Sequence, residues 1–126
     1  MKVVLAIRQA DARLALELLL SEEPGVSIVG EASETAGLLA LTQTALPDLV
    51  VAEWTLPGRP LPAILDEMAP PMGSLRWLVL GQEPGERISA LAAGAHAFVL
   101  IGDPPKQLLT TVRQMRVSLY IRHDAK

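Results

Sequence analysis

The chain has no cysteine, only four aromatic residues (two Trp, one Tyr and one Phe) and few charges. The lack of cysteine excludes a disulfide framework, and the scarcity of aromatic residues requires a core of Leu, Val, Ile and Ala. No apolar stretch approaches the roughly 20 residues that a membrane-spanning helix needs. The apolar run at residues 3–7 is also too short for the core of a signal peptide, so we expect a cytoplasmic protein without membrane contact.

Apolar residues are nevertheless abundant and make up 50% of the 126 residues. This length and composition fit one globular domain and exclude a disordered chain. Lys and Arg number 11, while Asp and Glu number 14, which gives a net charge of −3. Since general nucleic-acid binding requires a basic surface, this mildly acidic balance disfavours it.

Five short apolar runs predict the strands of a sheet. They are mostly β-branched or aromatic and lack the polar alternation of a half-exposed strand, a pattern typical of parallel strands buried on both faces. The runs are residues 3–7, 26–29, 49–52, 78–80 and 98–100.

Segments with helical periodicity separate these runs. Asp11 is placed to cap the first helix, Ser33 or Glu34 opens the second, and Gly94 ends the fourth. Strands that alternate with helices predict an α/β fold, a doubly wound five-stranded parallel sheet with helices on both faces. The expected helices span about residues 11–20, 34–45, 62–68 (ending before the prolines at 70–71), 84–93 and 103–120.

Sites in such folds lie at the carboxyl ends of the strands. At those positions the sequence has Arg8 and Gln9 after the first strand, Glu53 after the third, Gly81 after the fourth and Ile101 after the fifth. They form no zinc, catalytic-triad or phosphate-loop pattern. With no activated nucleophile or acid–base pair in the chain, we do not expect an enzyme.

Three stretches resemble the receiver domains of response regulators. Residues 24–33 are similar to the region of the second strand, residues 47–58 to the phosphoacceptor strand and its loop, and residues 92–100 to the end of the fourth helix and the fifth strand. In this order and at this spacing they imply a flavodoxin-like (βα)5 receiver fold over residues 1–122, followed by a short C-terminal tail at 123–126.

The same resemblance shows that the chemical residues of the family are absent. Receiver domains hold Mg²⁺ with an acidic pair, and here that pair aligns with Arg8 and Gln9. The phosphorylated Asp aligns with Glu53, the following Thr or Ser with Gly81, and the Lys with Ile101. The resemblance therefore implies a degenerate receiver, a pseudo-receiver.

We expect no bound metal and no cofactor. Mg²⁺ prefers octahedral oxygen ligands, but Arg8 would place a fixed positive charge where the ion should lie, and Gln9 offers only a neutral oxygen. One alternative is that Asp11 supplies a ligand. Without the metal, nothing neutralises the charge that develops during phosphoryl transfer. We instead expect Arg8 and Glu53 to form an ion pair at this site, the alternative being two solvated charges without contact.

The resemblance also implies a partner face on the fourth helix, fifth strand and last helix. Phe98 aligns with the rotating aromatic switch of the family, and with Gly81 in place of a hydroxyl residue this switch should be uncoupled from phosphate. Val112, Arg113 and Arg116 lie on the last helix and belong to this possible face. The alternative is that the helix has only a core face and a solvated face. Trp54, next to Glu53, is expected either to cover the altered pocket or to pack on a neighbouring helix.

The predicted function is that of an atypical receiver domain, a phosphorylation-independent protein–protein interaction or dimerisation module in bacterial signal transduction. Its partner would be another protein or a second copy, and nucleic acid would be contacted only through an output domain outside this chain. Two alternatives stay open: a phosphorylation-competent two-component receiver that uses Glu53 as a non-standard acceptor, and a regulatory domain that senses a small ligand.

Overall fold

The computed structural model describes residues 1–68 and 75–124. The prolines at 70–71, predicted to end the third helix, and residues 125–126 of the predicted tail lie outside the described residues. Residues 123–124, predicted to belong to that tail, instead continue the last helix, which ends at Asp124.

Five strands and five helices alternate along the described chain, as predicted. The strands are all parallel and stand in the order β2-β1-β3-β4-β5. The strand order therefore reverses between β1 and β3: β2 lies on one side of β1, and β3, β4 and β5 follow on the other. The fold is the doubly wound, flavodoxin-like arrangement that the sequence predicts. The elements are β1 (Lys2–Ala6), α1 (Ala10–Ser21), β2 (Ser27–Ala32), α2 (Thr35–Thr44), β3 (Leu49–Glu53), α3 (Leu61–Met68), β4 (Arg76–Gly81), α4 (Glu86–Ala92), β5 (Ala97–Leu100) and α5 (Pro105–Asp124).

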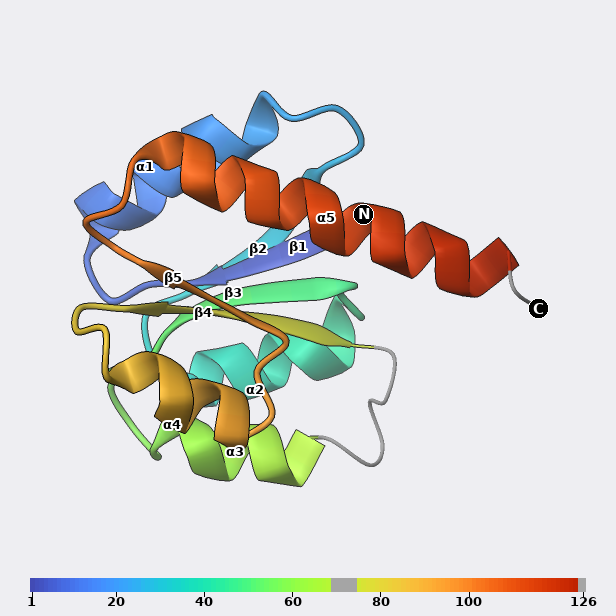
Figure 1. The fold of residues 1–126 in the computed structure, drawn as a ribbon. Helices are drawn as coiled ribbons and strands as arrows, with labels where there is room; N and C mark the ends of the chain where they lie inside the picture. Colours follow the sequence, from blue (N-terminus) through green and yellow to red (C-terminus); the bar gives the residue numbers. More distant parts are fainter. Residues whose placement is uncertain (69–74, 125–126) are drawn as a thin grey trace.

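The helices cover the sheet in two layers. Helices α1 and α5 lie on one face, and α2, α3 and α4 lie on the other (Figure 1). Alternate residues of each strand enter the two cores: Val3 and Leu5 of β1 face α1 and α5, while Val4 and Ala6 face the other layer. Among the described residues, none of the helices combines the length and the apolar character needed to cross a membrane.

Two local predictions about helix ends have different outcomes. The first helix begins at Ala10 with Gln9 at its cap position, so Asp11 lies in the first turn and the prediction that it caps the helix is wrong. A carboxylate in the first turn is still favourable, because the amino end of a helix carries partial positive charge. Gly94 follows α4 with a φ of +116°, a conformation that only glycine adopts easily, which confirms the predicted stop.

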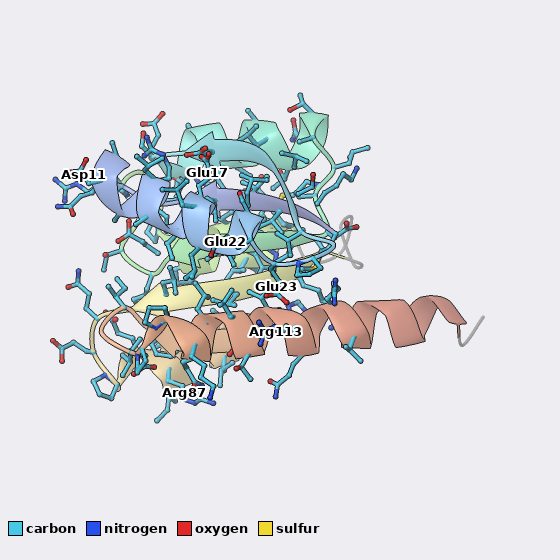
Figure 2. All side chains as sticks on the ribbon, turned by 90° about the horizontal axis from the view of Figure 1, so that it is seen from above. Asp11, Glu17, Glu22, Glu23, Arg87 and Arg113 are labelled. Carbon is cyan, nitrogen blue, oxygen red and sulfur yellow. The ribbon has the colours of Figure 1, made fainter. Side chains whose placement is uncertain are left out.

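At the opposite, amino-terminal edge of the sheet, α5 is bound to the turn that follows α1. The Arg113 guanidinium donates two hydrogen bonds to the buried Glu23 carboxylate, at 2.6 and 2.9 Å (Figure 2). Arg116 donates to the Pro24 carbonyl. The hydrogen bond from Arg113 lowers the pKa of Glu23. We call these residues the α5 clamp.

Candidate functional site

The five positions singled out in the sequence meet at the carboxyl edge of the sheet. Arg8 and Gln9 follow β1, Glu53 ends β3, Gly81 ends β4, and Ile101 follows β5. The register of the parallel strands fixes this meeting, since β3 lies between β1 and β4 in the sheet. In doubly wound folds, ligands bind at the carboxyl ends of the strands where the strand order reverses, which here is between β1 and β3.

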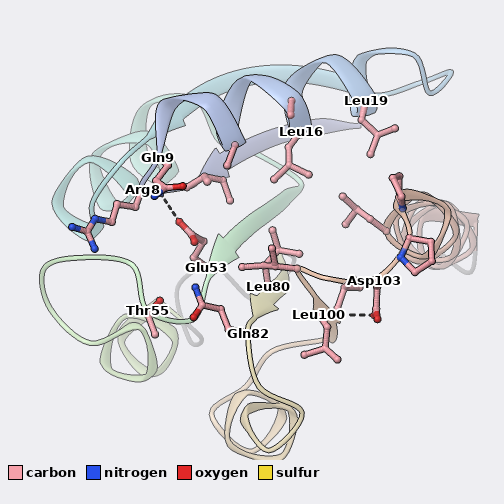
Figure 3. A pocket seen from close by; sticks show the side chains of 18 residues that line it. Arg8, Gln9, Leu16, Leu19, Glu53, Thr55, Leu80, Gln82, Leu100 and Asp103 are labelled. Atoms are coloured by element: carbon pink, nitrogen blue, oxygen red, sulfur yellow. Dashed lines mark hydrogen bonds between the residues drawn. The ribbon is translucent and has the colours of Figure 1, made fainter.

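Glu53 is bound by the main chain of residue 8. The backbone N–H of Arg8 donates to Glu53 Oε1 at 2.5 Å, while the Arg8 guanidinium extends away from the carboxylate (Figure 3). Among the described residues, the Arg8 guanidinium and the Glu53 carboxylate form no ion pair. The predicted ion pair is therefore wrong. An amide fixed at a strand end can bind the carboxylate without ordering a long side chain, which would cost conformational entropy.

The oxygen donors at this edge do not fit a magnesium ion. One oxygen of Glu53 is directed at an amide hydrogen, and Gln9 contributes at most a neutral oxygen. Asp11, the alternative ligand, is exposed and lies at the outer end of α1 (Figure 2). Within the part of the chain that the structure describes, no three His, Asp or Glu residues gather closely enough to hold a metal. Mg²⁺ prefers several carboxylate and water oxygens in octahedral geometry, which this edge does not offer.

The place of a side chain at position 81 is filled by Phe98. A Cβ atom added to Gly81 would collide with the Phe98 ring and approach Glu86 Oε1 at 2.8 Å. The ring is buried, and the Glu86 carboxylate accepts the backbone N–H groups of Gln82 and Glu83 at 2.8 and 3.2 Å. The loop after β4 is thus closed by Glu86 and Phe98, with no hydroxyl group directed toward Glu53.

The position of the family lysine is also without a cation. Ile101 is 49% exposed, and its backbone N–H donates to the Gly81 carbonyl at 2.8 Å. Asp103 lies just beyond and accepts the N–H of Leu100 at 3.3 Å. The loop after β5 therefore adds a carboxylate to this edge where receivers have an ammonium group.

The four residues predicted for a partner face are either buried or bound to other parts of the chain. Phe98 and Val112 are buried in the two cores, so neither is available to a partner in this conformation. Arg113 and Arg116 belong to the α5 clamp. Trp54 packs against the core on the α2–α3–α4 face and does not line the pocket, so the alternative that it covers the pocket is wrong.

Two features of the structure were not predicted from the sequence. The first is the bond between Glu23 and Arg113, which are 90 residues apart and carry no shared motif. The second is a cavity of about 520 Å³ between α1 and α5, which reaches the carboxyl edge at Glu53 (Figure 3). The only signal for it in the sequence is the alanine pair Ala12 and Ala15 on an otherwise leucine-rich helix.

A comparison of sequences finds response regulators. No protein-family model matches the chain. The nitrate/nitrite response regulator NarL of Escherichia coli K12 is 29% identical over 115 residues, which cover 90% of this chain and 53% of NarL, and NarL of Escherichia coli O6:H1 matches equally. The chain spans about half the length of the curated relatives it matches.

Solved structures of response regulators share the fold. A LuxR-family two-component response regulator from Aurantimonas has a TM-score of 0.86 and 23% identity, with 93% of this chain and 85% of that chain covered. The receiver domain of response regulator NarL from Mycobacterium tuberculosis has a TM-score of 0.81 and 25% identity, with coverages of 90% and 93%. The isolated receiver domain of RcsB from Salmonella enterica has a TM-score of 0.84 and 17% identity, with coverages of 92% and 88%.

The strand order and the parallel five-stranded sheet are those of the flavodoxin-like receiver fold. The chain is similar to the receiver domains of two-component response regulators in fold and, more weakly, in sequence.

Proposed function

We propose that this receiver domain works without phosphorylation, as a cytoplasmic protein–protein interaction or dimerisation module. The observation that carries the proposal is the state of Glu53, whose carboxylate is bound by the Arg8 amide at an edge where the described residues bring together no metal-binding set of oxygens. A phosphoryl group carries nearly two negative charges at neutral pH. On this edge the position of the family lysine holds the alkyl side chain of Ile101, so no ammonium group at that position would offset the charge.

The arrangement of Phe98 supports the same proposal. In a responsive receiver, a hydroxyl group after β4 would link the phosphoryl group to the aromatic residue of β5. Here the Phe98 ring itself fills the space beside Gly81. Phosphorylation at position 53 would therefore have no side chain through which to move the ring, and the domain keeps one conformation.

The direct test is exposure to a small phosphodonor. The protein is incubated with acetyl phosphate and Mg²⁺, and its intact mass is measured; we expect no gain of a phosphoryl group. A matched variant with Arg8→Asp, Gln9→Asp, Glu53→Asp, Gly81→Thr and Ile101→Lys restores the five family residues and should gain one. A phosphoryl group on Glu53 of the unchanged protein would contradict the proposal and establish the alternative of a non-standard acceptor.

Exposed apolar side chains support an interaction surface on the α4 side of the molecule. Ile88 and Leu91 of α4 are 78% and 39% exposed, and Ile101 lies exposed after β5. Ile88 and Leu91 are three residues apart and so lie on one side of α4, and adjoining exposed apolar groups are typical of protein-binding sites. We propose that a partner protein or a second copy of the chain binds there.

This surface is tested by substitution. Ile88→Asp should weaken binding of the partner, or self-association measured by analytical ultracentrifugation, by at least about tenfold. Leu14→Asp is the matched control, because Leu14 is comparably exposed but lies on α1. Equal effects of the two substitutions would place the interface elsewhere.

A further inference from the structure

A cavity lies between α1 and α5. The Arg13 side chain donates to the Ile7 carbonyl at 2.9 Å and to Glu31 of β2 at 3.1 Å, which fixes the amino-terminal half of α1 beside β2. Leu20, at the other end of α1, is the one fully buried side chain of this helix. The first turns of α1, the ends of β3, β4 and β5 and the start of α5 all contribute residues to the wall of the cavity.

Small side chains leave this space open. Ala12 and Ala15 of α1 line the cavity and are exposed to it, where larger residues would close the gap. The remaining wall is apolar and continuous with the core on this face. Its members are Leu16, Leu19, Leu80, Val99 and Leu108.

The mouth of the cavity has a different chemistry. Glu53 lies there beside the neutral amides of Gln9 and Gln82, while the Asp103 carboxylate lies at the α5 side of the cavity and accepts the Leu100 N–H (Figure 3). The Arg8 guanidinium extends away from Glu53 (Figure 3), and among the described residues Oε2 of Glu53 accepts no hydrogen bond. The partial positive charge at the amino end of α1 already faces a carboxylate, because the Arg8 N–H just before this helix donates to Glu53. The mouth thus favours a hydrogen-bond donor or a cation and disfavours a phosphate.

We infer that this cavity is a binding site for a small molecule with an apolar body and a cationic, hydrogen-bond-donating head such as a primary amine. Its volume of about 520 Å³ lies within the range of ligand pockets, which are mostly apolar with a few polar groups that orient the ligand. The apolar body would lie against Leu16, Leu80 and Leu108, with the head at Glu53. The site goes beyond the proposed function and does not depend on it, since binding needs no phosphorylation and no partner.

Three probes of the same apolar body test the head chemistry: phenylbutylamine, phenylbutanol and phenylpentanoate. Each is titrated into the isotopically labelled protein, and the amide signals of α1, β5 and the loop after β5 are followed by NMR. We expect saturable shifts of cavity residues, with the amine bound at least about tenfold more tightly than the carboxylate, because a charge-assisted hydrogen bond to Glu53 favours the cation. Glu53→Gln should remove the preference for the amine over the alcohol.

Substitutions that fill the cavity test the location. Ala15→Phe should weaken binding of the amine at least about tenfold by occupying the apolar space, while Leu18→Phe, on the exposed outer side of α1, should leave it unchanged. Ala12→Leu is a milder second variant, should the larger substitution disturb folding. The inference is overturned if no probe shifts the cavity residues, if the carboxylate binds more tightly than the amine, or if folded Ala15→Phe and Ala12→Leu proteins bind as well as the unchanged chain.

Discussion

The two faces of the sheet are covered in different ways. On the α2–α3–α4 face, side chains such as Leu38, Leu61 and Ile64 are fully buried in a continuous core. On the α1–α5 face the core is closed at the amino-terminal edge by the α5 clamp but opens into the cavity at the carboxyl edge. One face therefore has a filled core, and the other leaves space at the carboxyl edge, the edge at which doubly wound folds in general bind ligands.

The largest expected effect is the difference between leucines on the two faces. Leu38→Ala should cost about 2–5 kcal/mol of unfolding free energy, because it leaves a cavity in a filled core. Leu16→Ala should cost about 1 kcal/mol or less, because this half-buried side chain already borders an open space. Urea unfolding followed by circular dichroism measures both, and equal losses would mean that the two faces are packed alike.

An intermediate effect is expected at Gly81. Gly81→Ala introduces a Cβ atom where the Phe98 ring lies, and overpacking of this kind costs about 1–3 kcal/mol. Gly85→Ala is the matched control, since nothing lies within 4 Å of a Cβ at that position. The NMR signals of the Phe98 ring should move in the first variant and stay in place in the second. An unmoved ring with unchanged stability would show that Phe98 does not fill the space at position 81.

A smaller effect, dependent on pH, is expected from the α5 clamp. Because the pKa of Glu23 is lowered from its ordinary value of 4.5, the folded state binds its proton less readily than the unfolded chain. The stability that Glu23 contributes is therefore present above about pH 4.5 and is lost as the pH falls through the lowered pKa.

Glu23→Gln tests this linkage. The unchanged protein should melt at a higher temperature than the variant at neutral pH, and the difference should shrink as the pH is lowered below 4.5. Glu22→Gln, at the exposed neighbouring position, should show no such change. A difference between the unchanged protein and Glu23→Gln that is constant with pH would exclude the charge of Glu23 as its source.

The fold could be predicted from the sequence because its signals are local. Apolar runs such as residues 49–52 mark strands buried on both faces, and Gly94 marks a helix end through its backbone conformation. The limits of β2 were less visible. This edge strand continues to Ala32 through polar residues such as Glu31, because only one of its sides is paired in the sheet.

The site could be predicted only in part, because its position follows from topology but its contacts do not. The sequence places Arg8 and Glu53 at one edge, yet it cannot tell whether the carboxylate is bound by the guanidinium or by the backbone amide of the same residue. The cavity is lined by residues of α1, of three strand ends and of α5, and no sequence pattern shows how these distant segments pack. The prediction that Asp11 caps a helix was wrong because the cap position is Gln9, two residues earlier.

The central claim is that the carboxyl edge around Glu53 does not bind the metal and phosphoryl group of responsive receivers. It is tested most directly by NMR titration with Mg²⁺ and beryllium fluoride, with the Arg8 amide signal as the reporter. We predict that this signal stays in place, because its hydrogen bond to Glu53 persists. A saturable shift of the Arg8 amide, seen only when both additions are present, would contradict the account.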